Sequence, residues 1–309
     1  MSVLKGKDIL DGAQFTREEI DAIMTLADDF RGQLSERRGL DLLKGAVLAA
    51  LFFEPSTRTR LSFETAMQRL GGAVVGFSSA ESTSVAKGET LADTSRTVDQ
   101  YVDAIAMRHP RIGSAREAAD VANAPVLNGG DGAGQHPTQA LLDLYTIGQE
   151  RGKVEGNTIA LVGDLKNGRT VHAGVEIYKH YDCKLICVAP EVLRMPAEVI
   201  GRLRDRGFAI EETESLEAAL PRADVVYMTR IQKERFADPA EYDRLKDAYV
   251  LDRAMVERLR PDVTVLHPLP RINEIAVDVD TLPNAAYFRQ AQNGVFVRMA
   301  LLASVLGVA

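Results

Sequence analysis

Short apolar runs alternate with longer polar or helical stretches along most of the chain. The first run, residues 47–53, is continuous enough for a buried strand, and Phe63, Met67 and Leu70 then repeat at helical spacing. Three similar runs follow in the first half, each after a stretch long enough for a crossover: 74–77, 104–107 and 125–128. This alternation predicts a parallel sheet with helices between its strands.

The second half repeats the pattern after a turn rich in glycine and lysine at 151–157. A helix that begins near Gln139 leads into this turn, which is therefore the expected boundary between two domains. The strands predicted beyond it, with a helix at 196–206 among them, are 158–162, 184–189, 224–228 and 263–266. We expect an α/β protein of two domains, each a parallel sheet flanked by helices, and a packing helix at 294–309.

Length and composition fit a globular protein of this kind. The chain has 309 residues, of which 46% are hydrophobic, and domains usually hold ~100–200 residues. No stretch reaches the ~18 apolar residues of a membrane span, and no signal-like run opens the chain, so we expect the cytoplasm. The formal net charge of −7 argues against nucleic acid, whose binders usually carry a basic surface.

The two cysteines, Cys183 and Cys187, fall near one predicted strand. If both lie on it they are about 13 Å apart, too far for a disulfide, so we expect buried thiols. No Cys/His cluster has the spacing of zinc ligands, and no metal is expected.

The first predicted strand is followed by Glu54-Pro55-Ser56-Thr57-Arg58-Thr59-Arg60. Pro55 blocks continuation of the strand, and Ser56 or Thr57 can cap the helix that follows. Amides at a helix start, hydroxyl groups and a guanidinium together favour a phosphate. The alternative is an ordinary capped helix with solvated arginines.

Polar residues also follow the third and fourth strands of the first half. Arg108 follows the third, and a glycine-rich loop leads from the fourth to His136 and Gln139 at a proline-started helix. Ligands bind beyond the carboxyl ends of parallel strands, so we expect these residues in one region. Taken alone, His136 is more typical of a capping residue than of a catalytic one.

In the second half, the run 164–170 follows a strand but lacks the glycine spacing of dinucleotide sites. Arg169 is therefore interpreted as a ligand contact. Arg230 and Gln232 follow another strand, and His-Pro-Leu-Pro-Arg at 267–271 follows the last. The two prolines of this segment have no backbone N–H to donate. Its backbone carbonyl groups are therefore available to accept hydrogen bonds from an NH2 group of a ligand.

Six segments, in this order, resemble the aspartate/ornithine carbamoyltransferase family across nearly the whole chain: FFEPSTRTRLSFETAMQRLGG, MRHP, HPTQALLDL, VGDLKNGRTVH, MTRIQKER and HPLPRINEI. Ornithine enzymes of this family typically carry a Cys in an H-C-L-P motif. The corresponding segment here reads HPLP, with Pro268 in the place of that Cys. Arg169 and Arg230 also imply a dicarboxylate acceptor, because guanidinium pairs select carboxylates and would repel a second ammonium.

The resemblance implies a carbamoyltransferase that uses carbamoyl phosphate and L-aspartate, in an early step of de novo pyrimidine biosynthesis and without a cofactor. It implies a carbamoyl phosphate-binding domain at 1–137 completed by 294–309, a linking helix at 138–150 and an aspartate-binding domain at 151–293. The residues it assigns to carbamoyl phosphate are Ser56, Thr57, Arg58, Thr59, Arg108, His136, Gln139, Pro268 and Leu269. The residues it assigns to aspartate are Lys87, Arg169, Arg230 and Gln232.

The resemblance also implies a homotrimer with active sites at subunit interfaces, because the family supplies a Ser and a Lys from a neighbouring subunit. Ser84 and Lys87 match them, with a spacing one residue shorter than in some relatives, and 236–241 carries a small insertion by the same comparison. Regulatory chains or a dihydroorotase are further candidate partners.

The implied chemistry is attack by the uncharged α-amine of aspartate on the carbamoyl carbon, through an oxyanion that needs donors already in place. Arg58, Thr59, Arg108 and His136 are the expected catalytic residues, with His136 as a polariser. Three alternatives remain: another amine acceptor such as ornithine, a non-catalytic relative that binds carbamoyl phosphate, and a nicotinamide-dependent oxidoreductase, whose phosphate fingerprint is absent.

Overall fold

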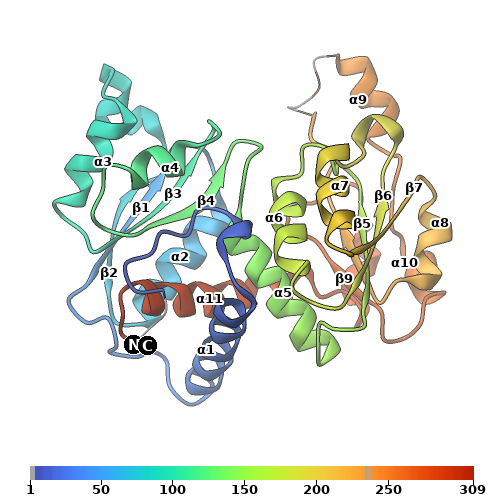
Figure 1. Cartoon of the computed structure of the whole chain (residues 1–309), viewed down its shortest axis with the longest axis horizontal. Coiled ribbons are helices and arrows are strands. Elements are labelled where there is room, and N and C mark those ends of the chain that lie inside the picture. Colours follow the sequence, from blue (N-terminus) through green and yellow to red (C-terminus); the bar gives the residue numbers. More distant parts are fainter. Residues whose placement is uncertain (1–3, 234–235, 237) are drawn as a thin grey trace. The chain divides into compact units, whose positions relative to one another are not determined.

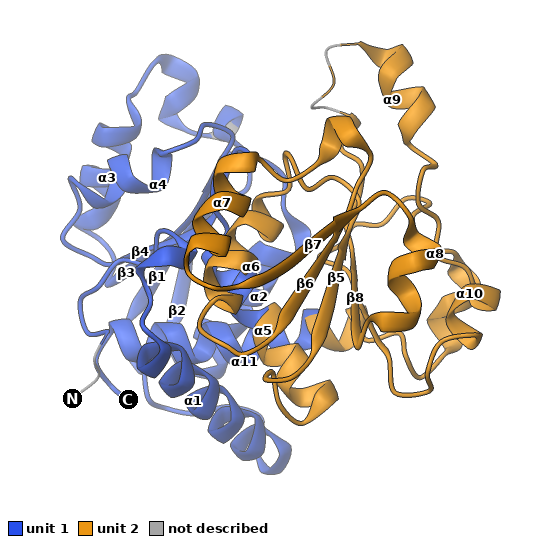
Figure 2. Ribbon diagram, turned by 45° about the vertical axis from the view of Figure 1, so that its right-hand side comes forward, with its two compact units in different colours: residues 1–142, 291–309 blue, residues 143–290 orange. Residues whose placement is uncertain are grey.

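The computed structural model describes residues 4–233, 236 and 238–309 (Figure 1). The chain divides into two compact units, coloured in Figure 2: unit 1 holds residues 1–142 and 291–309, and unit 2 holds residues 143–290. Two helices carry the chain from one unit into the other, α5 (Pro137–Arg151) and α11 (Tyr287–Val305).

Unit 1 is built on a four-stranded parallel sheet in the order β2-β1-β3-β4. Its strands are β1 (Val47–Phe52), β2 (Ala73–Phe77), β3 (Ala104–His109) and β4 (Val126–Asp131). Its helices, besides its parts of α5 and α11, are α1 (Arg17–Glu36), α2 (Thr57–Arg69), α3 (Leu91–Asp99) and α4 (Ser114–Ala119). Three short 3-10 helices complete it, η1 (Gly12–Gln14), η2 (Ala80–Ser82) and η3 (Ser84–Lys87).

The C-terminal helix returns to unit 1, as the sequence predicts. Arg298 of α11 donates to the Thr138 hydroxyl at 3.2 Å, and its guanidinium lies 5.0 Å from the ring centre of Phe63 on α2. Both contacts are buried, so the last helix completes the first core rather than forming a tail.

Unit 2 is built on a five-stranded parallel sheet in the order β7-β6-β5-β8-β9. Its strands are β5 (Thr158–Val162), β6 (Lys184–Val188), β7 (Ala209–Thr213), β8 (Val225–Met228) and β9 (Thr264–Leu266). Its helices include α6 (Arg169–Tyr178), α7 (Ala197–Asp205), α8 (Leu216–Ala219), α9 (Pro239–Leu245) and α10 (Arg253–Glu257). The predicted α/β class with two parallel sheets is confirmed.

Among the strands that the described residues form, β7 is the one absent from the sequence prediction. β7 reads Ala-Ile-Glu-Glu-Thr and lies at the edge of its sheet, partly open to solvent on both faces. It therefore lacks the continuous apolar run that marks the buried strands of a parallel sheet.

The strand orders define where a ligand site belongs in each unit. In unit 1 the connection from β1 leads to β2 on one side, and the next leads to β3 on the other. In unit 2 the connections from β5 lead to β6 and then β7 on one side of β5, and the next connection leads to β8 on its other side. Such a switch point leaves a crevice beyond the carboxyl ends of the strands, which is where ligands bind in open α/β sheets.

Both cysteines are buried and reduced, as predicted. Burial raises the pKa of each thiol to about 12, so neither is a reactive thiolate near neutral pH. In the part of the chain that the structure describes, no helix is long and apolar enough to cross a membrane. No group of three or more His, Cys, Asp or Glu among the same residues is arranged to hold a metal ion.

Candidate functional site

The loop after β1 leads directly into α2 at the switch point of unit 1. Ser56 takes the N-cap position in an extended conformation, but its side chain does not cap the helix. Instead its hydroxyl lies 3.4 Å from Arg108 Nη1. The predicted capping role of this side chain is therefore wrong, while its position at the helix start is as expected.

Arg108 reaches this helix start from the end of β3. The register of the sheet places Phe52 beside Arg108, so the ends of β1 and β3 are neighbours. Arg108 Nε donates to Glu54 Oε1 at 2.6 Å, and both side chains are partly buried. Glu54 joins the candidate site through Arg108, although its sequence context predicts no role for it; its place directly after β1 is the signal that could have indicated one.

Thr57, Arg58 and Thr59 form the first turn of α2. Thr57 and Arg58 are exposed, whereas Thr59 is buried. Desolvation by neighbouring groups lowers the pKa of the Arg58 guanidinium although the residue keeps an exposed surface, and a guanidinium stays charged at neutral pH. The turn therefore presents a permanent positive charge beside the amides of a helix start.

His136 and Thr59 face each other across unit 1. The His136 Nε2 atom lies 3.4 Å from the Thr59 hydroxyl, and both side chains are buried. Gly129 in β4 permits this approach, because a Cβ there would lie 3.2 Å from Thr59 Cγ2 and 3.0 Å from the Met107 carbonyl oxygen. Gln139 donates its backbone N–H to the His136 carbonyl at 3.0 Å, so it belongs to the same helix start.

The loop that carries His136 is held by Asp131, another residue for which the sequence predicts no role. Its carboxylate accepts from the Gln135 backbone N–H at 2.7 Å and from the Gly113 backbone N–H at 2.8 Å. Asn128 donates to the same carboxylate at 3.2 Å. These bonds tie the glycine-rich loop to the start of α4, so His136 stands on a fixed support.

In unit 2, the loops after β5 and β8 meet at the switch point. Gly163 has a φ of 116°, and a Cβ there would lie 2.4 Å from the Thr229 carbonyl oxygen, so glycine is required. Arg169 is the first residue of α6 after one loop, and Arg230 follows β8 on the other. The predicted pair of arginines thus stands at the ends of neighbouring strands.

Gln232 is linked to the same loop, because its side-chain amide donates to the Asn167 carbonyl at 3.4 Å. Asn167 in turn donates its backbone N–H to Asp164 at 2.9 Å. Asp164 is fully buried, and burial raises the pKa of its carboxyl although Asn167 and the Gln232 backbone N–H both donate to it. The two loops therefore share one buried acceptor.

The HPLP segment after β9 is shaped by His267. The Leu269 backbone N–H donates to His267 Nδ1 at 2.7 Å, so Nδ1 carries no proton and the ring is neutral with its proton on Nε2. Nε2 then donates to Glu274 Oε1 at 2.7 Å, and both residues are buried. Leu269 has a φ of 56°, and the peptide bond that joins it to Pro270 is cis.

A buried chain of side chains continues this support. The His267 backbone N–H donates to Gln290 at 2.9 Å, Gln290 donates to Asp143 at 2.6 Å, and Tyr227 donates to Asp143 at 2.7 Å. Within the described residues, the carbonyl groups of Pro268 and Leu269 accept no hydrogen bond. The backbone of this turn is thus held in place, and its two carbonyl groups can accept hydrogen bonds from a ligand.

Ser84 and Lys87 lie on η3, which packs against η2 and α3 in unit 1. Both side chains are exposed, and neither forms a hydrogen bond or ion pair with another side chain of the described residues. Their helix ends at Gly88, whose φ of 95° is readily adopted by glycine. Within the described part of the chain, no hydrogen bond or ion pair joins either side chain to the site residues above. Of the predicted insertion 236–241, residue 237 lies outside the described residues, as do 234 and 235.

Two family descriptions match the chain in tandem. The carbamoyl phosphate-binding domain of the aspartate/ornithine carbamoyltransferases matches residues 7–149. The aspartate/ornithine-binding domain of the same family matches residues 155–305. Together they cover almost the whole chain.

Individual relatives are similar over their full length. The chain is 53% identical over 304 residues to the aspartate carbamoyltransferase catalytic subunit of Thermococcus kodakarensis, covering 98% of each. It is 50% identical over 308 residues to the catalytic subunit of Methanopyrus kandleri, covering 99% of each. The Trypanosoma cruzi aspartate transcarbamoylase solved with carbamoyl phosphate and aspartate superposes with a TM-score of 0.94 at 46% identity, covering 99% of this chain and 98% of that one.

Proposed function

The chain belongs to the aspartate/ornithine carbamoyltransferase family, and we propose that it transfers the carbamoyl group of carbamoyl phosphate to the α-amine of L-aspartate. The products are N-carbamoyl-L-aspartate and phosphate, in an early step of de novo pyrimidine biosynthesis. The observation that carries the proposal is the end-to-end similarity, at about 50% identity, to catalytic subunits of that name. Unit 1 would bind carbamoyl phosphate and unit 2 would bind aspartate.

The phosphate group is assigned to the first turn of α2. Ser56, Thr57 and Thr59 offer hydroxyl donors there, and Arg58 adds a guanidinium that can grip two oxygens. Arg108 is the second cation, oriented by Glu54 on its Nε side and adjacent to Ser56 on its Nη1 side. The helix dipole adds about half a positive charge at the same end.

The carbamoyl carbonyl oxygen is assigned to Thr59, Arg108 and His136. The 3.4 Å approach of His136 Nε2 to the Thr59 hydroxyl supports a common point of action for the two side chains. Donors fixed before the reaction stabilise a developing oxyanion without reorganisation. The carbamoyl NH2 group is assigned to Gln139 and the carbonyls of Pro268 and Leu269, which accept no other bond among the described residues.

Aspartate, rather than ornithine, is the acceptor that unit 2 supports. Arg169, Arg230 and Gln232 follow neighbouring strands, and guanidinium groups pair with carboxylates while repelling an ammonium side chain. Pro268 stands where ornithine enzymes of the family typically carry cysteine.

In the reaction, the lone pair of the uncharged amine attacks the carbamoyl carbon and forms the new C–N bond. The bond from that carbon to the phosphate oxygen then breaks, and phosphate leaves with the bonding electrons. The amine proton passes to the departing phosphate, so no enzyme base or covalent intermediate is required. The protein contributes position and electrostatic stabilisation.

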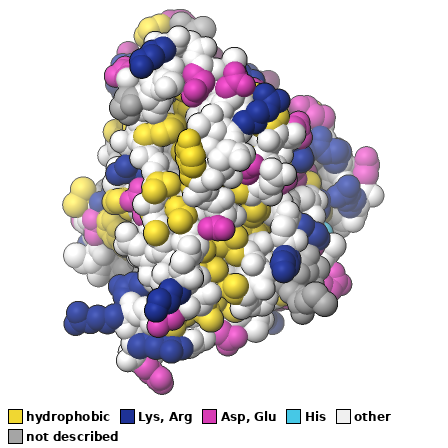
Figure 3. Space-filling model, turned by 90° about the vertical axis from the view of Figure 1, so that its left-hand side faces the viewer, with side chains coloured by type: hydrophobic (Ala, Val, Ile, Leu, Met, Phe, Trp, Pro, Cys, Tyr) yellow, Lys and Arg dark blue, Asp and Glu magenta, His cyan; other side chains and the backbone are white. Residues whose placement is uncertain are grey.

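The active assembly is proposed to be a cytoplasmic homotrimer, in which Ser84 and Lys87 reach the site of a neighbouring subunit. Both side chains are exposed and without a side-chain partner among the described residues. Unit 1 also has three exposed large apolar residues: Leu61 is 47% exposed, Val75 49% and Tyr101 69%. Val75 lies on the edge strand β2. Figure 3 shows apolar side chains gathered among charged ones on one face. Regulatory chains or a dihydroorotase remain candidate partners.

The proposal is tested by incubating the purified chain with carbamoyl phosphate and aspartate, and by measuring its native mass. Formation of carbamoyl aspartate at a mass of three chains supports both the reaction and the assembly. Absence of product from a folded trimer would reject the reaction, while product from a monomer would reject the shared site.

A further inference from the structure

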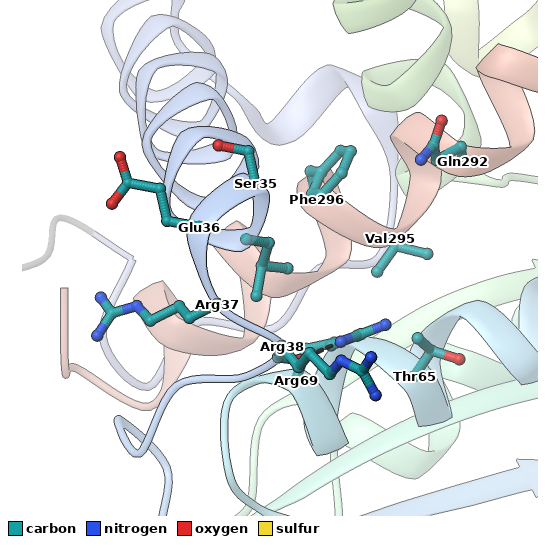
Figure 4. Close-up of a pocket in the computed structure, with 10 residues that line it drawn as sticks. Ser35, Glu36, Arg37, Arg38, Thr65, Arg69, Gln292, Val295 and Phe296 are labelled. Atoms are coloured by element: carbon teal, nitrogen blue, oxygen red, sulfur yellow. Dashed lines mark hydrogen bonds between the residues drawn. The ribbon is translucent and has the colours of Figure 1, made fainter.

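Unit 1 contains a pocket that none of the proposed substrate residues lines. It has a volume of about 490 Å³ and lies between the C-terminal ends of α1 and α2 and the middle of α11 (Figure 4). Sites for small molecules usually have volumes of ~300–1,000 Å³. The pocket is therefore large enough for a metabolite.

The lining carries more positive charge than its surroundings neutralise. Three arginines line the pocket, Arg37, Arg38 and Arg69, and none forms an ion pair with a carboxylate among the described residues. Arg37 donates to the Gln33 side chain, and Arg69 donates to the Arg38 carbonyl. Glu36 is the acidic residue of the lining, and Figure 4 shows its carboxylate directed away from Arg38 and Arg69.

Helix ends explain part of this arrangement but not all of it. Arg37 is the C-cap residue of α1, and Arg69 is the last residue of α2, where cations are favoured by the helix dipole. Each helix end supplies about half a negative charge, so two ends and Glu36 offset roughly two of the three positive charges. A net positive charge is left over the pocket, on a chain whose formal net charge is −7.

The rest of the lining is divided between polar and apolar groups. Figure 4 shows the Arg38 and Arg69 guanidinium groups extending toward the side on which Thr65 lies. Phe296 and Val295 of α11 supply an apolar wall, and Phe296 is largely buried. A ligand that satisfies both parts has an anionic group that can accept hydrogen bonds from two guanidinium groups, and an apolar or planar remainder.

We propose that this pocket binds an organic phosphomonoester. The phosphate lies between the guanidinium groups of Arg38 and Arg69, whose planar donors match phosphate oxygens, and Thr65 adds a hydroxyl donor. The organic part lies against Phe296 and Val295. This site is separate from the proposed substrate phosphate site, because Ser56–Arg58 lie at the start of α2 and Arg69 lies at its end.

Phenyl phosphate is the probe, since it is a small phosphomonoester with a ring, and titration calorimetry is the readout. The titration uses Arg58→Ala, because phosphates are also expected at the substrate site. In that background, adding R38Q and R69Q is expected to weaken one phenyl phosphate site by about tenfold or more. Inorganic phosphate is expected to bind the same site about tenfold more weakly than phenyl phosphate, because it buries no ring.

The matched control is R206Q with R258Q in the same background. Arg206 and Arg258 are exposed arginines at the C-cap positions of α7 and α10, so they match the charge removed, and Arg38 and Arg69 likewise lie within one residue of a helix C-cap. This control is expected to leave phenyl phosphate binding unchanged. If R38Q/R69Q does not fold, R69Q alone is expected to weaken the site by several-fold. Binding that survives these changes undiminished, or equal affinity for phosphate and phenyl phosphate, overturns the proposal.

Discussion

Arg108 Nε donates a 2.6 Å hydrogen bond to Glu54 Oε1, across the neighbouring ends of β1 and β3. The bond fixes one edge of the guanidinium, while Nη1 faces Ser56 at the start of α2. The orientation of Arg108 toward the proposed phosphate site thus depends on a carboxylate from another strand.

Glu54→Gln is expected to raise the KM for carbamoyl phosphate about tenfold, because a neutral amide holds the guanidinium less firmly. Both side chains retain some solvent contact, at 17% and 25% exposure, so the free energy of unfolding should fall by no more than ~1 kcal/mol. Steady-state kinetics and urea unfolding measure the two effects. Glu117→Gln, which breaks the surface pair with Arg111, is the control and should change neither. An unchanged KM in Glu54→Gln would show that Glu54 does not orient Arg108 for carbamoyl phosphate binding.

Arg58→Ala is expected to reduce kcat by at least ~10²-fold, the usual cost of losing one electrostatic donor to the transition state. Its side chain is exposed, so the thermal unfolding midpoint should stay nearly unchanged. Arg116→Ala, an exposed arginine on α4, serves as the control for loss of charge. Near-normal turnover in Arg58→Ala would reject the phosphate grip.

Arg230→Ala is expected to raise the KM for aspartate far more than the KM for carbamoyl phosphate, since the two substrates are assigned to different units. Initial rates with each substrate varied in turn provide the comparison. Arg222→Ala, which removes a surface pair with Glu211, should leave both constants unchanged. Equal increases for both substrates would contradict the division of labour.

Glu274→Gln is expected to change the pH dependence of stability. Burial acts to raise the pKa of the Glu274 carboxyl, but hydrogen bonds from His267 and from the Ile272 backbone prevail and hold it below its usual value of 4.5. A depressed carboxyl pKa stabilises the folded state above the unfolded pKa, and this contribution is lost as the pH falls below ~4.5.

At pH 7 the variant should therefore be less stable by about 1–3 kcal/mol, and the difference should shrink in acid. Urea unfolding at pH 7 and at pH 4 gives the comparison, with Glu257→Gln on the exposed pair with Arg253 as the control. A difference that is constant with pH would mean that the carboxylate charge does not hold His267.

The parts of the fold that the sequence predicts are those with continuous apolar runs. β1, β3 and β5 are buried on both faces, so their residues reveal them without structural information. β7 is an edge strand with two glutamates and gives no such signal. Once the strands are predicted, the place of the loops after them follows as well, because parallel strands direct their carboxyl ends to one edge of the sheet.

The supporting contacts of the site are not predictable in this way. Asp143 contacts Tyr227 and Gln290, which are 84 and 147 residues away along the chain, and no local pattern links them. Ser56 shows a different failure: local rules predict a capping hydroxyl, but the side chain lies within reach of Arg108 instead. Contacts made by the fold override the local preference of a serine before a helix.

The most direct measurement is a competition in which the purified chain receives carbamoyl phosphate with equal concentrations of aspartate and ornithine, and both carbamoylated products are quantified. We predict carbamoyl aspartate as essentially the whole product, with Arg230→Ala losing most of that activity. Citrulline as the main product, or neither product from folded protein, would contradict the assignment.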